Sequence, residues 1–409
     1  MKKTALALLL FMTTCYTQAQ ITAPEIISWI QTPGQTGYSG IASNVQSVNY
    51  TSSNVYVSCT CIPGYDIGPW AGNPNTPANQ NFCFAITRTP VKNTGTLTPT
   101  PLGHIGVWTN GVSLFNVSDA MSYNNQNVWF RNAYFFEGPS FDDCLGHPQQ
   151  QGEYHTHVNP TCLYDDQANT VHSPIIGYAF DGFPIYGAYA YSDTAGLGAI
   201  KRMTPSYRTR TMTDRTTLPS GSVASFAGPA INGQYPLGAF IQDFEYVPGL
   251  GDLDEHNGRF AVTPDYPARI YAYYVAIDSN QTPIYPYLLG PTYYGTVPAG
   301  NTGMQSGHNT VPGAAVVYTP VASGFSELNT AGISTYPNPV CDFISVDFGT
   351  TISATHRIDV IDMNGKQVAY ITSTDTKVQI AMNEFSSGVY LVRVTDEEGK
   401  SFQQKIFKQ

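Results

Sequence analysis

Charged side chains are scarce in this sequence. Asp, Glu, Lys and Arg make up 12% of its 409 residues, and the excess of acidic over basic residues gives a formal net charge of −10. No basic patch or stripe is present, and nucleic-acid binding depends on Lys and Arg side chains that neutralise phosphates. The composition therefore argues against nucleic acid as a partner.

Long hydrophobic runs are also missing beyond the N-terminus. Lys2 and Lys3 precede the apolar residues 5–12, and the small residues around Ala19 fit a signal-peptidase cleavage site. The apolar run is too short to span a bilayer. We expect residues 1–19 to be a signal peptide and the exported chain to have no membrane span.

Familiar catalytic and nucleotide-binding motifs are missing too. The sequence has no phosphate-binding glycine loop, no Gly-x-Ser-x-Gly turn and no His-Glu-x-x-His helix. We therefore expect no nucleotide cofactor, and any activity has to be inferred from other groups of polar residues.

The residues that are abundant favour strands and turns. The chain contains 28 Tyr and 20 Phe, which favour strands, and 37 Gly and 29 Pro, which favour turns. We expect a mostly β protein with a β-rich central domain over residues 22–318, a linker over 319–333 and a small immunoglobulin-like β-sandwich over 334–409. The strands expected in this sandwich are 343–348, 357–361, 367–371, 377–381, 388–395 and 402–407. Residues Met363–Lys366 predict a hairpin turn between the second and the third.

The last fifth of the chain contains four characteristic motifs. They are Tyr336-Pro337-Asn338-Pro339, the turn Asp362–Lys366, the segment Ser386–Val392 and the closing Lys405–Gln409. Together they resemble the type A C-terminal domain of the type IX secretion system of Bacteroidetes. The resemblance implies recognition by the type IX secretion machinery and a secreted or cell-surface location. The alternative is an ordinary immunoglobulin-like module without a sorting role.

Six cysteines remain once a signal peptide with Cys15 is removed. They are Cys59, Cys61, Cys83, Cys144, Cys162 and Cys341. An exported protein meets oxidising conditions, so disulfides are expected. A disulfide between Cys144 and Cys162 would close a loop worth roughly 3 kcal/mol in the chain-entropy model, and we favour it over a role of both residues as metal ligands. Since Cys341 lies in the C-terminal domain, an odd number is left in the central domain, where at least one thiol is expected to be unpaired.

Four of the eight histidines lie close together in the sequence. They are His147, His155, His157 and His172. Successive side chains of a strand alternate between its faces, so His155 and His157 project to the same side. Neutral imidazole binds copper and zinc well, and this pair therefore predicts a copper or zinc site. The candidates for further ligands are His147, His172, Glu153, Asp142, Asp143 and Asp181.

Asp181 is singled out by its position after the apolar run 175–180. A buried carboxylate is costly unless it is hydrogen-bonded, paired with a charge or bound to a metal. The alternative to a metal site is a structural core in which every ring nitrogen is satisfied by a carbonyl or hydroxyl group.

Several motifs extend over most of residues 55–295. They are Asp142–His147, Gly152–His157, His172–Gly177, Asp181–Gly187, Leu253–Phe260, Thr263–Pro267 and Tyr271–Tyr274. Together they resemble the YHYH protein family, named for a Tyr-His-Tyr-His motif, which implies a domain but no established activity. Thr156 replaces the second tyrosine of the motif, and His256 stands where the family pattern suggests a cysteine.

Three functions are compatible with these features. The first is an extracellular protein that binds copper or zinc. The second is a metal-dependent extracellular enzyme, a hydrolase or an oxidoreductase, with Glu153 and Asp181 as candidate general bases. The third is a cell-surface module that binds glycans or proteins without a metal. The spacing of His155 and His157 favours the first.

Overall fold

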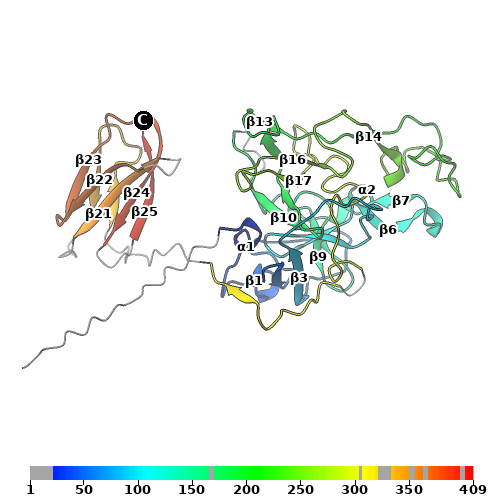
Figure 1. The fold of residues 1–409 in the computed structure, drawn as a ribbon, viewed down its shortest axis with the longest axis horizontal. Helices are drawn as coiled ribbons and strands as arrows, with labels where there is room; N and C mark the ends of the chain where they lie inside the picture. The colour runs from blue at the N-terminus through cyan, green and yellow to red at the C-terminus, as the bar shows by residue number, and fades with distance from the viewer. Residues whose placement is uncertain are drawn as a thin grey trace, which may run out of the picture. The chain divides into compact units, whose positions relative to one another are not determined.

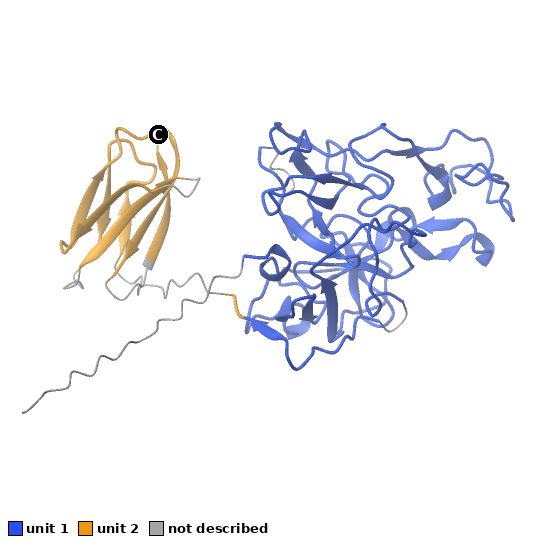
Figure 2. Cartoon of the chain, in the orientation of Figure 1, with its two compact units in different colours: residues 1–318 blue, residues 319–409 orange. Residues whose placement is uncertain are grey.

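The computed structural model describes residues 22–164, 170–303, 306–320, 333–349, 355–362, 367–396 and 401–408. The expected signal peptide, most of the expected linker and the expected hairpin turn lie outside these ranges. The chain forms two compact units, residues 1–318 and 319–409 (Figure 2).

Helices are short throughout the described ranges. The α-helices are α1 (Pro24–Ile27) and α2 (Ala133–Phe136). The 3-10 helices are η1 (Tyr38–Gly40), η2 (Tyr123–Asn125), η3 (Gly138–Ser140) and η4 (Ile241–Asp243). None of the described helices is long and apolar enough to cross a membrane. The mostly β fold expected from the composition is confirmed.

An eight-stranded sheet runs through the first unit. Its strands, in spatial order, are β16 (Gly258–Ala261), β17 (Ile270–Tyr274), β11 (Pro184–Tyr186), β10 (Ile175–Ala179), β4 (His104–Trp108), β5 (Ser113–Phe115), β9 (Tyr154–Thr156) and β8 (Gly146–Pro148). Neighbouring strands are antiparallel, except that β11 runs parallel to β17 and β5 runs parallel to β9. Pairing with β5 therefore joins β9 and β8 to the rest of the sheet.

A four-stranded antiparallel sheet joins the two ends of this unit. Its strands, in spatial order, are β18 (Val316–Tyr318), β1 (Val45–Tyr50), β2 (Asn54–Cys59) and β3 (Phe82–Thr87). Figure 1 shows β18, in yellow, next to the blue β1, although the two are far apart in the sequence. Three two-stranded ribbons complete the unit: β6 (Ser118–Ser122) with β7 (Phe130–Asn132), β12 (Tyr189–Tyr191) with β13 (Ile200–Arg202), and β14 (Tyr207–Thr209) with β15 (Phe244–Tyr246).

The core of the first unit is apolar and rich in aromatic side chains. One buried cluster combines residues of both larger sheets, among them Val57, Phe84, Trp108, Ile185 and Tyr273. The predicted disulfide between Cys144 and Cys162 is present and confirms that expectation. Cys59, Cys61 and Cys83 are thiols, as the odd count of cysteines led us to expect for at least one of them.

The second unit is a small β-sandwich. One sheet contains β19 (Ser334–Tyr336), β20 (Phe343–Asp347) and β23 (Lys377–Ala381), and the other contains β22 (Gln367–Ser373), β21 (His356–Asp362), β24 (Gly388–Thr395) and β25 (Ser401–Lys408). Apolar residues of both sheets share one core, including Ile344, Val360, Val392 and Ile406. All six strands expected from the sequence are present, because their alternating apolar residues form the inner faces of the sandwich.

Candidate metal centre

Three histidines meet where β8 and β9 pair. His147 and His155 are directly opposite each other in this antiparallel pair, and His157 follows β9 two residues after His155. Tyr154 and Thr156 alternate with these histidines and have other partners. The Tyr154 hydroxyl donates to Asp142, and the Thr156 hydroxyl accepts from the Trp108 indole. The two-residue period of a strand thus places the histidines together, as expected.

Glu137 completes a group of four possible ligands with His147, His155 and His157. The Nε2 atoms of His147 and His157 lie 3.2 and 3.1 Å from Glu137 Oε2, and the Nε2 atoms of His155 and His157 lie 3.1 Å apart. The four ligand atoms all lie within 4.8 Å of one another. The three histidines are buried, whereas the Glu137 side chain is 25% exposed.

Backbone carbonyls fix the tautomers of His155 and His157. His155 Nδ1 lies 3.1 Å from the Glu153 carbonyl oxygen, and His157 Nδ1 lies 2.5 Å from that of Asn116. A carbonyl oxygen can only accept, so each Nδ1 carries the proton and donates it. Each neutral ring is then left with a lone pair on Nε2, and the two lone pairs face each other.

His147 has the same tautomer through a different partner. The Ser140 hydroxyl donates to the Glu137 carbonyl oxygen, so its own oxygen accepts from His147 Nδ1 at 2.9 Å. His147 Nε2 then presents a lone pair to Glu137 Oε2, itself an acceptor. Within the described ranges no hydrogen bond reaches His147 Nε2. Four acceptors therefore converge without a donor between them.

Glu137 comes from a short helical segment above the histidines. It follows α2, which is capped by the Asn132 side chain, and precedes η3. Phe141, just after η3, packs against the rings of His147 and His157 at centroid distances of 4.8 and 6.1 Å. Sequence reasoning missed Glu137. Its one signal was a single carboxylate after the aromatic run 134–136.

Protonation of the group is governed by burial and by charge. Burial raises the pKa of Glu137, and His147 and His157, when they are protonated and donate to the carboxylate, lower that pKa well below its ordinary value. Burial lowers the pKa of His147, and burial together with the neighbouring histidines lowers the pKa of His155 far below its ordinary value. Asp119 on β6 is a further carboxylate nearby, and burial and the Glu137 charge raise its pKa to about 6. Neutral imidazoles beside a carboxylate are the forms that bind metal ions.

The dimensions of the group fit a small divalent ion. Tetrahedral zinc with bonds of about 2.0–2.1 Å places its ligand atoms roughly 3.3 Å apart. Three of the six separations, His147–Glu137, His157–Glu137 and His155–His157, are 3.1–3.2 Å and thus close to this value. Hydrogen bonds from Nδ1 to backbone carbonyls are also the usual supports of metal-binding histidines.

Two residues expected in the group lie elsewhere. His172 Nδ1 contacts the Ser173 carbonyl oxygen, and its ring packs against Tyr186 at 5.0 Å. Asp181 Oδ2 accepts hydrogen bonds from the Tyr273 hydroxyl at 2.6 Å and from a backbone amide at 2.8 Å. The expectation that His172 and Asp181 join His155 and His157 is thus corrected. Both lie beside β10 and β11, and the order of the sheet separates these strands from β8 and β9.

The other candidate carboxylates also have different partners. Asp142 accepts from the Tyr154 hydroxyl, and Glu153 Oε2 accepts from Gln149. Asp143 is exposed, and the structure does not bring it into the group. Burial raises the pKa of Asp181 to about 6, because its carboxylate is fully enclosed.

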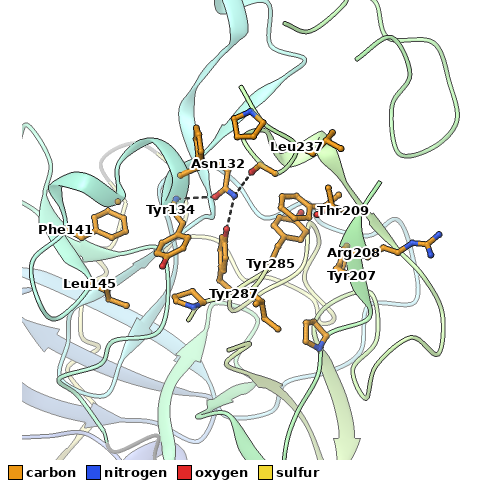
Figure 3. A pocket seen from close by; sticks show the side chains of 18 of the residues that line it. Asn132, Tyr134, Phe141, Leu145, Tyr207, Arg208, Thr209, Leu237, Tyr285 and Tyr287 are labelled. Atoms are coloured by element: carbon orange, nitrogen blue, oxygen red, sulfur yellow. Dashed lines mark hydrogen bonds between the residues drawn. The ribbon is translucent and has the colours of Figure 1, made fainter. Parts of the chain in front are cut away.

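A separate pocket lies beside the segment that carries Glu137. It has a volume of about 820 Å³, and seven of its 19 lining residues are aromatic, including Tyr134, Phe141 and Tyr287 (Figure 3). Asn132 also lines the pocket, and its side-chain amide donates to the Tyr287 hydroxyl. Its volume falls within the range of small-molecule sites in proteins.

Comparison with known proteins supports the assignment of both units. The model of the YHYH protein family matches residues 83–286, and that of the secretion system C-terminal sorting domain matches residues 334–409. No curated protein sequence matches the chain.

Two solved structures were among the similar ones. A DUF3244 family protein with an immunoglobulin-like β-sandwich fold from Bacteroides vulgatus is 12% identical, with a TM-score of 0.19, over 20% of this chain and 92% of its own. PorZ, an essential bacterial surface component of the type IX secretion system of Porphyromonas gingivalis, is 12% identical, with a TM-score of 0.18, over 95% of this chain and 53% of its own. This chain therefore spans about half the length of PorZ, and neither likeness carries a functional argument.

The sorting domain marks the chain as a secreted or cell-surface protein that the type IX secretion system recognises. The chain thus contains a YHYH domain and, after it, a secretion system C-terminal sorting domain.

Proposed function

We propose that this secreted protein binds a zinc or copper ion through His147, His155, His157 and Glu137. The observation that carries the proposal is the convergence of three imidazole lone pairs and one carboxylate in a mostly buried space. Acceptors that face one another repel unless a cation lies between them, and an unmatched group of this kind calls for an explanation. A divalent ion at the centre would turn each of these repulsions into a bond.

Zinc is the preferred ion of the two. It favours four ligands in a tetrahedron and accepts both imidazole nitrogen and carboxylate oxygen. Copper also binds imidazole well, but Cu(II) prefers a planar arrangement. The contacts of 3.1 and 3.2 Å around Glu137 are closer to a tetrahedral separation of roughly 3.3 Å than to the roughly 2.8 Å of a square.

The exposure of Glu137 supports a second candidate function, a metal-dependent hydrolase. Its side chain is 25% exposed, whereas those of His147 and His157 are 8% and 4% exposed. Solvent therefore reaches the group on the side of Glu137. A water or substrate that displaced this carboxylate would occupy an open position next to three histidines, as in catalytic zinc sites.

The test is the metal content of the purified full-length secreted protein, measured by elemental analysis. We expect about one zinc or copper ion per chain in the wild type and almost none in the His155→Ala/His157→Ala double variant. His172→Ala is the matched control, because His172 lies outside the group and should leave the content unchanged. A wild type that takes up neither metal after reconstitution, or a double variant that keeps its metal, would overturn the proposal.

A further inference from the structure

A second arrangement of reactive side chains lies outside the metal group. Ser306 Oγ is 2.6 Å from His104 Nε2, and His104 Nδ1 is 3.4 Å from Glu153 Oε1. A hydroxyl, an imidazole and a carboxylate in this order form the arrangement in which a serine is activated as a nucleophile. The three residues come from distant parts of the chain, so the sequence alone did not associate them.

The hydrogen bonds around Glu153 favour the tautomer that such activation requires. Gln149 donates to Glu153 Oε2 at 2.8 Å, which leaves Oε1 to face His104. A carboxylate only accepts, so His104 Nδ1 carries the proton and Nε2 has the free lone pair. That lone pair is directed at the hydroxyl of Ser306 and can accept its proton.

The loop that carries Ser306 is held against the imidazole by a glycine. Gly307 has a φ of +81°, and a Cβ there would lie 2.7 Å from the Phe84 ring, so only glycine fits. Its carbonyl oxygen accepts from the Cys83 amide of β3 at 2.6 Å. Phe84 in turn packs edge-on against the His104 ring at 5.7 Å. Ser306 is thus presented, half-buried, over a histidine whose ring is fixed by packing.

We propose that Ser306 is a nucleophile toward carboxylic esters, with His104 as its general base and Glu153 as the residue that positions His104. The proton of Ser306 Oγ passes to His104 Nε2 as Oγ forms a bond to the ester carbonyl carbon. The bond from that carbon to the alcohol oxygen then breaks, and the proton on His104 passes to the leaving alcohol. Water repeats the sequence on the acyl-serine, which releases the acid and restores Ser306.

This site acts through atoms that the metal group does not use. The Glu153 side chain faces His104, whereas its backbone carbonyl oxygen faces His155. The competing structural role is that the Ser306 hydroxyl donates to the Gly303 carbonyl oxygen at 2.7 Å and only anchors the loop. In that role Ser306 would not react.

The test is covalent labelling of the full-length protein with a fluorophosphonate, followed by mass spectrometry of its peptides. Attack by Ser306 forms an Oγ–P bond and releases fluoride, and the proton passes to His104. We expect labelling at Ser306, none in Ser306→Ala, and a rate about 100-fold lower in His104→Gln. Labelling should survive a chelator, which separates this inference from the proposed metal site.

Two further variants keep the outcome interpretable. Thr302→Ala, in the same loop, should label like the wild type. Glu153→Asp should retain part of the rate that Glu153→Gln loses, since a purely structural role would not distinguish a carboxylate from an amide in this way. Thermal unfolding would verify that each variant is folded. A wild type that stays unlabelled would overturn the proposal. So would a label that is still present in Ser306→Ala.

Discussion

Two groups of largely buried polar side chains in the first unit each contain a carboxylate but differ in their hydrogen bonding. Around Glu137 the facing atoms of His147, His155 and His157 are all acceptors. Around Asp181 the carboxylate faces donors, since the Tyr273 hydroxyl and a backbone amide both donate to it. Burial of histidine or aspartate therefore does not by itself identify a ligand site. A ligand site is identified by an excess of acceptors over donors among the facing atoms.

Removal of the proposed metal ion should destabilise the folded protein through the Glu137 group, and this is the largest effect expected; the Asp181 group should not respond to it. An ion present at about 1,000 times its dissociation constant stabilises the folded state by about 4 kcal/mol. A chelator should therefore lower the melting temperature of the wild type, and added zinc should restore it. The His155→Ala/His157→Ala variant should melt at the same temperature with and without chelator. Equal shifts of the melting temperature in the wild type and the double variant would contradict a metal site at His155 and His157.

The Asp181 group should instead show a dependence on pH. Burial raises its pKa from 3.8 to about 6, so the folded state favours the protonated acid. Its stabilising contribution is present below the unfolded pKa and is lost as the pH rises through about 6, by an amount on the order of 3 kcal/mol. Urea unfolding at pH values of about 4 and 7 should show a smaller loss of stability in Asp181→Asn than in the wild type.

His155 should show the opposite dependence of stability on pH. Burial lowers its pKa, so its contribution to stability is present above the ordinary histidine pKa and is lost as the pH falls through its lowered value. Acidification of the metal-free protein should therefore lower its free energy of unfolding through the Glu137 group.

If Asp181→Asn and the wild type had identical dependences of stability on pH, the carboxyl group of Asp181 would not titrate as described.

The Glu137→Gln variant tests whether Glu137 is the fourth ligand of the proposed ion. The amide keeps the shape of the side chain and removes its charge, so we expect metal affinity to fall about tenfold or more, which is about 1.4 kcal/mol. Competition with a chromophoric chelator would measure this change. Glu255→Gln is the control, because Glu255 is exposed and lies outside the group. An unchanged affinity in Glu137→Gln would leave a site of three histidines only.

The smallest effect is expected on the opposite face of β9. The Thr156 hydroxyl accepts from Trp108 Nε1 at 2.8 Å, and both residues are buried. Thr156→Val keeps the shape but leaves the indole N–H without a partner, which costs about 1 kcal/mol. Denaturant unfolding should show this loss while the metal content stays the same. A loss of metal would mean that the two faces of β9 are not independent.

Much of the fold could be predicted because it depends on local patterns. The six expected strands of the C-terminal sandwich are present, since apolar residues at every second position define a strand with one buried face. The same period placed His155 and His157 on one side of β9, and the short separation of Cys144 and Cys162 allowed their disulfide.

Tertiary structure alone decided which residues join these local features. Glu137 reaches the histidines because the chain between α2 and β8 folds back over them, and His147 joins because it pairs directly with His155. His172 and Asp181 are placed elsewhere by strand order, which depends on long-range pairing that no local pattern encodes. The sequence by itself determined that two histidines, one in β9 and one just after it, face the same side. The packing of distant segments determined which residues those histidines contact.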